Sequence, residues 1–121
     1  MPMKIYQYPK CSTCRKALKW LDARGVKYEA VDIVTAPPKK AELTRALKSG
    51  LPLKKLFNTS GQSYREGGWG EKLASVTQAQ AIDALAADGK LIKRPFILNG
   101  EQVLVGFDEA AYTAAFGKSP K

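Results

Sequence analysis

The first 35 residues carry a strand, a helix and a second strand in that order, and this pattern constrains the fold more than any other feature. Lys4–Tyr8 is rich in residues that favour β-strands. A helical pattern, which Ser12 or Thr13 can cap, follows and runs to about Arg24. Tyr28–Val34 alternates in the manner of a half-buried strand. Because the helix is long enough to cross over, the two strands are predicted to lie parallel in one sheet.

Residues 36–89 interrupt the strand pattern with predominantly helical sequence. One helix is predicted from Lys39 to about Ser49, after a Pro-Pro pair that breaks the chain. Tyr64–Gly70 is rich in glycine and is expected to be irregular. Another helix begins at Thr77 and ends at Asp88-Gly89. We expect this stretch to be a helical insert.

Two short strands and a helix complete the pattern. Phe96–Leu98 and Gln102–Val105 flank Asn99-Gly100, a dipeptide typical of hairpin turns. A helix is predicted from residue 108 to about 116, and residues 117–121 are expected to fray. Without the insert the order is βαβ-ββα, the thioredoxin-like α/β arrangement. We therefore expect one domain over residues 1–121, with its core at about 1–35 and 90–117.

Composition agrees with a globular domain. The chain has 121 residues, 45% of them hydrophobic and 26% charged, and this length buries a core without metal or disulfide staples. Twenty Lys and Arg residues against eleven Asp and Glu give a net charge of +9, spread along the chain with no recognisable DNA- or RNA-binding motif. We interpret this charge as solvated surface and expect no direct nucleic-acid contact. The alternatives are an acidic partner, an anionic substrate or weak nucleic-acid contact.

The absence of histidine and the presence of only two cysteines limit the available chemistry. No Cys₄ or Cys₂His₂ zinc site can close within one chain, and we expect neither a bound metal nor a bound cofactor. The N-terminus lacks the apolar run of a signal peptide, and no apolar run approaches the roughly 20 residues that span a bilayer. We expect a cytoplasmic monomer without membrane contact. In that reducing compartment a cysteine pair is more often catalytic, redox-active or metal-binding than structural.

The cysteine pair lies where the first predicted strand enters the helix. Cys11 and Cys14 are three residues apart, so both sulfurs should lie on one side of the first turn, close enough for a disulfide. The positive helix N-terminus, with Lys10, Arg15 and Lys16, should lower the pKa of a thiol there. We predict that Cys11 is the nucleophile and that Cys14 resolves its mixed disulfide. Two structural cysteines, or half of a zinc site shared across a dimer, are the alternatives.

Arg94-Pro95 is the second candidate feature, immediately before a predicted strand. A cis bond there would turn the backbone toward the cysteine loop, and the cation could pair with Cys11 or with an oxyanion. A proline at a strand edge beside a surface arginine is the alternative. We predict a catalytic role for Arg94. The residues predicted to contact substrate are Lys10, Ser12, Thr13, Arg94 and Pro95.

The chain resembles the ArsC/Spx family, the glutaredoxin-related arsenate reductases and their transcription-regulator relatives. Four segments carry the resemblance: YPKCSTCRKALKWL at 8–21, LFNTSGQSYRE at 56–66, DGKLIKRPFIL at 88–98 and VGFDEAAY at 105–112. The resemblance implies a thioredoxin-like fold with a helical insert, a nucleophilic Cys11, and Arg94 beside it with Pro95 in cis. The CxxC pair is most similar to the Spx-like branch.

The chain departs from the arginine pattern of the true arsenate reductases, which hold arsenate and its thiol adduct with three arginines. Arg94 matches one of them, whereas Asn58 stands at the first position, with Arg65 nearby, and Gly106-Phe107-Asp108 stands at the third. Losing two cations should remove several charge-assisted hydrogen bonds to an oxyanion, each worth roughly 1.5–3 kcal/mol. The pattern therefore favours other substrates over arsenate.

Three functions follow from the resemblance. The first is a thiol–disulfide oxidoreductase of arsenate-reductase type, with glutathione or thioredoxin as the thiol reductant. The second is a redox-sensing regulator that binds the C-terminal domain of the RNA polymerase α subunit. Gly50 could match a glycine at that contact, but it equally serves as a helix stop. The third is an arsenate reductase proper.

Overall fold

A computed structural model describes residues 3–100 and 102–116. It contains a four-stranded sheet with the strand order β2-β1-β3-β4. β1 and β2 are parallel, whereas β3 runs antiparallel to β1, and β4 antiparallel to β3. The strands are β1 (Met3–Gln7), β2 (Tyr28–Asp32), β3 (Phe96–Asn99) and β4 (Gln102–Val105). This is the predicted βαβ-ββα topology, and the fold is thioredoxin-like.

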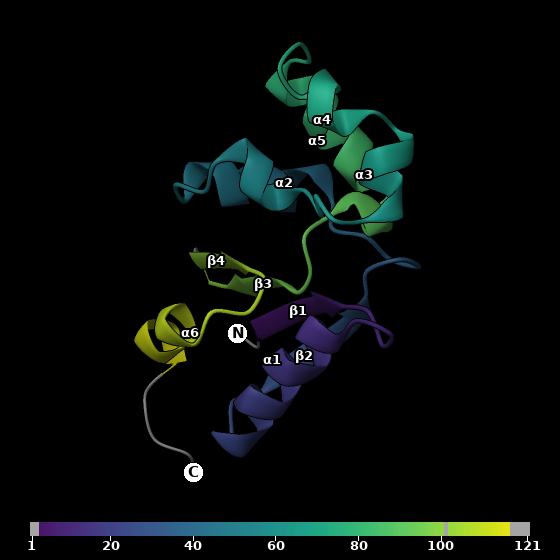
Figure 1. Cartoon of the computed structure of the whole chain (residues 1–121). Helices are drawn as coiled ribbons and strands as arrows, with labels where there is room; N and C mark the ends of the chain where they lie inside the picture. The colour runs from purple at the N-terminus through teal and green to yellow at the C-terminus, as the bar shows by residue number, and fades with distance from the viewer. Residues whose placement is uncertain (1–2, 101, 117–121) are drawn as a thin grey trace.

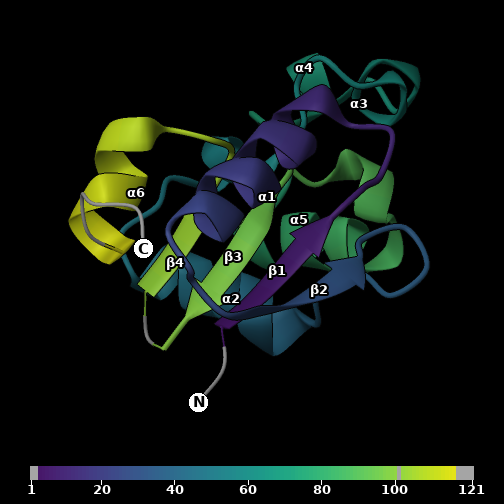
Figure 2. The same cartoon turned by 90° about the horizontal axis from the view of Figure 1, so that it is seen from below.

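Helices cover both faces of the sheet (Figures 1 and 2). α1 (Ser12–Ala23) and α6 (Glu109–Phe116) lie on one face. The helical segments of the insert lie on the other. They are α2 (Lys40–Lys48), η1 (Leu53–Leu56), α3 (Gln62–Glu66), α4 (Trp69–Lys72), α5 (Gln78–Ala87) and η2 (Gly89–Leu91). Within the described residues, no helix is long and apolar enough to cross a membrane.

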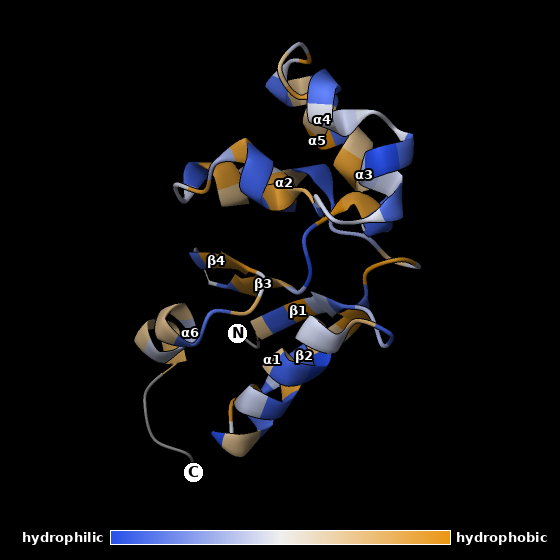
Figure 3. Ribbon diagram, in the orientation of Figure 1, coloured by the Kyte–Doolittle hydropathy of each residue, from blue (hydrophilic) through white to orange (hydrophobic). Residues whose placement is uncertain are grey.

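Side-chain alternation along the strands divides the core in two, with the hydrophobic β3 and β4 between the helical layers (Figure 3). The α1/α6 face buries Met3, Ile5, Ala17, Trp20, Leu21, Ile97 and Tyr112. The insert face buries, among others, Tyr6, Phe96 and Leu98 from the strands and Leu43, Leu56, Ile82 and Leu85 from the insert. Each large apolar side chain buried this way contributes about 1.5–3 kcal/mol, so apolar packing holds both layers.

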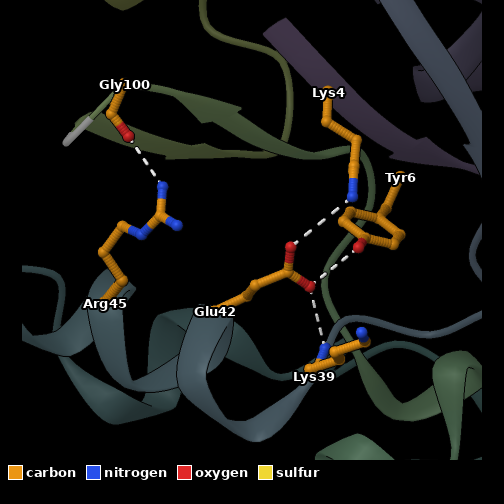
Figure 4. Close-up of polar contacts among 6 residues, drawn as sticks. All are labelled: Lys4, Tyr6, Lys39, Glu42, Arg45 and Gly100. Carbon is orange, nitrogen blue, oxygen red and sulfur yellow. Dashed lines mark hydrogen bonds and ion pairs between the residues drawn. The ribbon is translucent and has the colours of Figure 1, made fainter. Parts of the chain in front are cut away.

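A polar cluster also attaches the insert to the sheet (Figure 4). Tyr6 Oη donates to Glu42 Oε1 at 2.7 Å, and the Lys39 backbone N–H donates to the same oxygen at 2.9 Å. Lys4 Nζ lies 3.7 Å from Glu42 Oε2. At the hairpin, Arg45 Nη1 donates to the Gly100 carbonyl at 2.7 Å. One helix of the insert is thereby fixed to β1 and to the end of the β3–β4 hairpin.

Three local predictions are wrong. The N-cap of α1 is Cys11, not Ser12 or Thr13, because the Cys11 sulfur accepts the free N–H of the first turn. The Tyr64–Gly70 segment contains most of α3 and the start of α4, where packing of the buried Trp69 overrides the glycines. The hairpin turn begins one residue later than the Asn-Gly dipeptide indicates, because Asn99 still pairs with Gln102.

The other boundaries agree with the predictions to within about two residues. The helix predicted to begin at Thr77 is α5, and Thr77 is its N-cap, accepting from the Gln80 N–H at 3.1 Å. Gly50 ends α2 with a φ of +108°, a conformation that favours glycine. The predicted frayed end, residues 117–121, lies outside the described residues.

Candidate active site

Cys11 is held at the N-terminus of α1 by backbone hydrogen bonds on both sides. Its N–H donates to the Tyr8 carbonyl at 3.0 Å, and its carbonyl accepts from the Arg15 N–H at 3.1 Å. Its Sγ accepts from the Cys14 N–H at 3.3 Å, and the side chain is half-buried. The sulfur therefore faces an N–H donor of the helix terminus, the arrangement that helices offer to anions, and remains open to a reactant.

Cys14 has the opposite environment. Its side chain is fully buried on the α1/α6 side, and both cysteines are free thiols. Burial, together with the contact with the Cys11 sulfur, raises the pKa of Cys14 to about 12, against the opposing effects of the Tyr8 backbone and the Arg94 charge. Cys14 is therefore a protonated thiol at neutral pH, and its buried side chain contacts Cys11 instead of solvent.

Arg94 lies beside the loop that carries Cys11. Its guanidinium carbon is 5.1 Å from the centroid of the Tyr8 ring, a cation–π contact with the residue whose carbonyl anchors Cys11. The Arg94–Pro95 peptide bond is cis, as the resemblance implied. Pro95 is buried, and its carbonyl accepts from the Gly106 N–H at 2.9 Å.

Arg94 reaches this position because the insert returns to the core by a short antiparallel bridge. Phe57 and Ile92 form the bridge. The Asn58 N–H donates to the Leu91 carbonyl at 2.8 Å, and the Lys93 N–H donates to the Leu56 carbonyl at 2.8 Å. The loop after η1 and the segment before β3 are thus tied together next to the cysteines.

These elements surround an open cleft of about 320 Å³. Its lining residues are Cys11, Ser12, Thr13, Asn58, Ser60, Gly61, Lys93 and Arg94. Of the predicted substrate contacts, the structure brings Ser12, Thr13 and Arg94 to the cleft with Cys11. Lys10 is exposed and Pro95 is buried, and neither lines the cleft, so the structure does not place these two in it.

Sequence reasoning missed Ser60 and Gly61 of the insert, and it placed Asn58 near the site only through the resemblance. Asn58, Ser60 and Gly61 belong to a stretch whose composition predicts a loop, but loop composition carries no information on what the loop faces. A Cβ on Gly61 would lie 2.6 Å from Asn58 Nδ2, so glycine is needed for this tight turn. The signal for this loop is Asn58 itself, which the resemblance matched to an arginine position of the arsenate reductases.

Arg65 does not replace the missing arginine of the arsenate reductases. Its Nη1 donates to the Ser60 carbonyl at 2.7 Å. The side chain lines a different pocket, with Tyr64 and Glu71, to which Cys11 does not contribute. Within the part of the chain that the structure describes, no cluster of three or more His, Cys, Asp or Glu side chains could hold a metal ion.

Comparison with known proteins assigns the chain to a family. The model of the ArsC family matches residues 6–115. The chain belongs to the ArsC family. The uncharacterized protein YusI of Bacillus subtilis is 51% identical over 111 residues, which cover 90% of this chain and 93% of YusI. An ArsC family related structure from Bacteroides fragilis is 42% identical, with a TM-score of 0.90 over 94% of this chain and 97% of that one.

More distant relatives in this family have two different named functions. The global transcriptional regulator Spx of Streptococcus agalactiae is 26% identical over 110 residues, covering 87% of this chain and 76% of Spx. The arsenate reductase of Rhizobium meliloti is 29% identical over 99 residues, covering 81% of this chain and 69% of the enzyme. Family membership alone therefore leaves both an enzyme and a regulator open.

Proposed function

We propose that this protein is a thiol–disulfide oxidoreductase in which Cys11 is the nucleophile and Cys14 the resolving thiol. The observation that carries the proposal is the asymmetry of the pair. Cys11 opens to the cleft and accepts a backbone N–H at its sulfur, whereas Cys14 is fully buried one turn further along α1. Oxidoreductases with a CxxC pair divide their two roles along this line.

The reaction proceeds through a mixed disulfide. The Cys11 thiolate attacks one sulfur of a substrate disulfide, and the other sulfur leaves as a thiolate that takes up a proton. Cys14 then loses its proton and attacks Cys11 Sγ, which releases the second substrate thiol and leaves a Cys11–Cys14 disulfide. A thiol reductant, glutathione or thioredoxin, returns the pair to two thiols. Such pools exist in the cytoplasm, where we place the reaction.

The environment of Cys14 orders these two steps. Its pKa is raised by burial and by the neighbouring Cys11 sulfur, so Cys14 stays protonated while Cys11 is free. Once Cys11 is in a mixed disulfide, its sulfur carries no charge, and this contribution to the raised pKa is removed. Cys14 thus loses its proton more readily after a substrate has bound covalently, although burial still acts to raise its pKa.

Arg94 and Lys93 make the cleft positively charged, and this favours substrates with a carboxylate or another anion near the disulfide. Arsenate itself is a weaker candidate, because Asn58 is in the cleft where an arginine would be needed and Arg65 is engaged at Ser60. The second candidate function is a redox-sensing regulator that binds the RNA polymerase α subunit. The CxxC pair and the similarity to Spx support it.

A trapping experiment tests the proposal. Cys14→Ser protein treated with hydroxyethyl disulfide should accumulate one adduct on Cys11, whereas the wild type should lose its two thiol hydrogens and keep no adduct. Cys11→Ser is the matched control. It should form neither an adduct nor an intramolecular disulfide. An adduct on Cys14, or intermolecular dimers as the only product, would show that the roles are wrong.

The same proteins separate the other candidate functions. Thiol consumption that depends on arsenate and on Cys11 would identify an arsenate reductase. Capture of the isolated α C-terminal domain by the wild type, in one redox state of the cysteine pair only, would identify a regulator. We expect neither result, and we expect disulfide reduction with glutathione or thioredoxin.

A further inference from the structure

A second hollow lies directly beside the Cys11 cleft and is left unexplained by the reaction. Its volume is about 690 Å³. Its lining residues are Thr13, Pro52, Lys54, Lys55, Phe57, Thr59, Lys93, Val105, Gly106, Phe107 and Asp108. We refer to it as the lysine groove. Thr13 and Lys93 line both hollows, so the groove and the cleft are contiguous.

The rim of the lysine groove is positively charged. Lys54, Lys55 and Lys93 are exposed, and none of them belongs to an ion pair among the described residues. Asp108 is the one carboxylate in the lining, and its Oδ1 already accepts the Ala110 N–H at the start of α6, at 3.0 Å. The groove is therefore complementary to a negatively charged partner.

Apolar groups lie between these charges. Val105 and Phe107 are half-buried, and Pro52 adds an exposed ring. Gly106 keeps this part of the groove flat. It has a φ of +74°, and a Cβ there would lie 3.2 Å from Lys93 Cε, so the Lys93 stem passes close over the backbone at the boundary with the cleft. An apolar side chain flanked by acidic residues would match this alternation.

We propose that the lysine groove binds an acidic polypeptide segment of a protein disulfide substrate, next to the cysteine that Cys11 attacks. This inference rests on the proposed function and specifies its substrate as a protein, not only a small thiol. The groove opens onto the Cys11 cleft at Thr13 and Lys93, so a chain seated in it would present its neighbouring cysteine to the sulfur. Nothing in the reaction changes, because the substrate disulfide is still the oxidant of the Cys11–Cys14 pair.

Short peptides test this assignment directly. Each peptide carries one cysteine as a mixed disulfide with thionitrobenzoate, and attack of Cys14 on the Cys11–peptide disulfide regenerates the free peptide. Release of thionitrobenzoate gives the rate of the first attack. One peptide has a leucine and three glutamates beside the cysteine, and its partner has lysines in place of the glutamates. At low salt the acidic peptide should react roughly 10-fold faster or more, and the difference should shrink as salt is added.

The double variant Lys54→Gln/Lys55→Gln should lose most of the preference for the acidic peptide. Lys27→Gln/Lys48→Gln removes the same charge from other exposed positions and should retain it. An acidic peptide with serine in place of leucine should react more slowly with the wild type, because it leaves the apolar part of the groove unfilled. If the two double variants prefer the acidic peptide to the same degree, the proposal is overturned, since the net charge of the protein and not the groove would then explain the preference.

Hydroxyethyl disulfide separates this proposal from the proposed function. If the wild type does not reduce it, the oxidoreductase assignment fails. If all proteins reduce it equally and no peptide preference is found, only the groove assignment fails. Tight binding of a short single-stranded oligonucleotide that is lost in Lys54→Gln/Lys55→Gln, with no rate preference between the acidic and basic peptides, would assign the groove to nucleic acid and overturn the proposal.

Discussion

The two helical layers are attached to the same sheet by different means. The α1/α6 layer is held by apolar and aromatic packing, in which Tyr112 makes edge contacts with Trp20 at 5.5 Å and with Phe107 at 5.1 Å between ring centroids. The insert layer is also held by apolar packing. In addition it has a titratable cluster around Glu42 and a close backbone contact between Gly89 and Ile33. The α1/α6 layer therefore depends mainly on apolar packing, whereas the attachment of the insert also depends on the ionisation of Glu42.

In the proposed reaction, this division also separates the cysteine chemistry from the selection of the substrate. Cys11 and Cys14 come from α1, while the insert supplies Asn58 to the cleft and Lys54 and Lys55 to the groove beside it. The rest of the site lies where the two layers meet. Substitutions in the insert should thus change stability or substrate choice without changing the chemistry of the cysteines in the α1/α6 layer.

The largest expected effect comes from Gly89, where the insert meets the end of β2. Gly89 is buried, and a Cβ there would overlap the Ile33 carbonyl oxygen and lie 2.7 Å from its carbonyl carbon. Gly89→Ala should therefore cost about 3 kcal/mol of unfolding free energy, because backbone has to move. Denaturant unfolding measures it. Gly70→Ala is the control, since its Cβ would meet Tyr64 at an ordinary 4.0 Å. Equal stability of both variants would contradict this account.

Gly89 also illustrates what the sequence could and could not predict. Asp88-Gly89 correctly indicated the end of a helix, but the φ of Gly89 is not positive, and the glycine is required by contact with Ile33 instead. That contact joins residues far apart in the chain, and no local pattern encodes it. The βαβ unit, the CxxC position and the hairpin were predictable because strand alternation, helical periodicity and turn residues are local signals.

The errors at the site have the same origin. The Cys11 N-cap was missed because cysteine is not among the usual capping residues, so Ser12 and Thr13 were favoured. Arg65 is close to Asn58 in sequence, yet its hydrogen bond to Ser60 takes it to another pocket. The placement of Asn58 and Lys93 depends on the bridge between the insert and the segment before β3, which is a tertiary contact.

The next largest effect tests the cysteine layer. Tyr112 Oη donates to the Gly106 carbonyl at 2.6 Å, and the pair is buried. Tyr112→Phe should cost roughly 1–3 kcal/mol of unfolding free energy, because it leaves a buried carbonyl without its donor. Tyr28→Phe removes a similar bond to Asp22, at 2.7 Å, from an exposed site and should cost less than about 1 kcal/mol. A larger loss of unfolding free energy in Tyr28→Phe than in Tyr112→Phe would contradict the expectation that the buried hydrogen bond contributes more.

Arg94 lies where the layers meet and should affect activity more than stability. Arg94→Lys keeps the charge but loses the planar guanidinium fork. If bidentate anion binding matters, KM for a carboxylate-bearing disulfide should rise by about 10-fold while kcat is kept. Arg94→Ala should lose affinity further and also slow alkylation of Cys11 at neutral pH. Unchanged kinetics and alkylation in both variants would reduce Arg94 to a structural partner of Tyr8.

Glu42 tests the pH sensitivity of the insert layer. Burial raises the pKa of the Glu42 carboxyl, but hydrogen bonds from the Lys39 N–H and from Tyr6, together with the charge of Lys4, outweigh it and hold that pKa below its usual value. A pKa that is lower in the folded state gives stability that is present above the unfolded value, roughly 4.3, and is lost as pH falls through the folded value.

Glu42→Gln should therefore lower the unfolding free energy by about 1 kcal/mol at neutral pH, and the difference from wild type should shrink in acid. Urea unfolding at several pH values measures both. Asp83→Asn serves as control because its ion pair with Lys40 is exposed, with 61% and 65% of the two side chains accessible, and should change stability by less than about 0.5 kcal/mol. A pH-independent deficit in the Glu42 variant would assign its effect to packing alone.

The smallest expected effect concerns Arg45, the outer attachment of the insert (Figure 4). Its hydrogen bond to the Gly100 carbonyl, 2.7 Å long, lies at the exposed end of the β3–β4 hairpin, where water competes for both groups. Arg45→Gln should cost about 0.5 kcal/mol or less. Arg45 also contributes to the low pKa of Glu42, one turn earlier on α2, so the two side chains should be coupled.

A double-mutant cycle of Arg45→Gln with Glu42→Gln measures that coupling, which should be a few tenths of a kcal/mol at low salt and vanish at high salt. Because the Gly100 hydrogen bond does not involve Glu42, the cost of Arg45→Gln that survives high salt belongs to the hairpin attachment alone. A coupling that persists at high salt would mean that the inner and outer attachments act as one unit. Protonation of Glu42 would then weaken the attachments at β1 and at the hairpin together, instead of the one at β1 first.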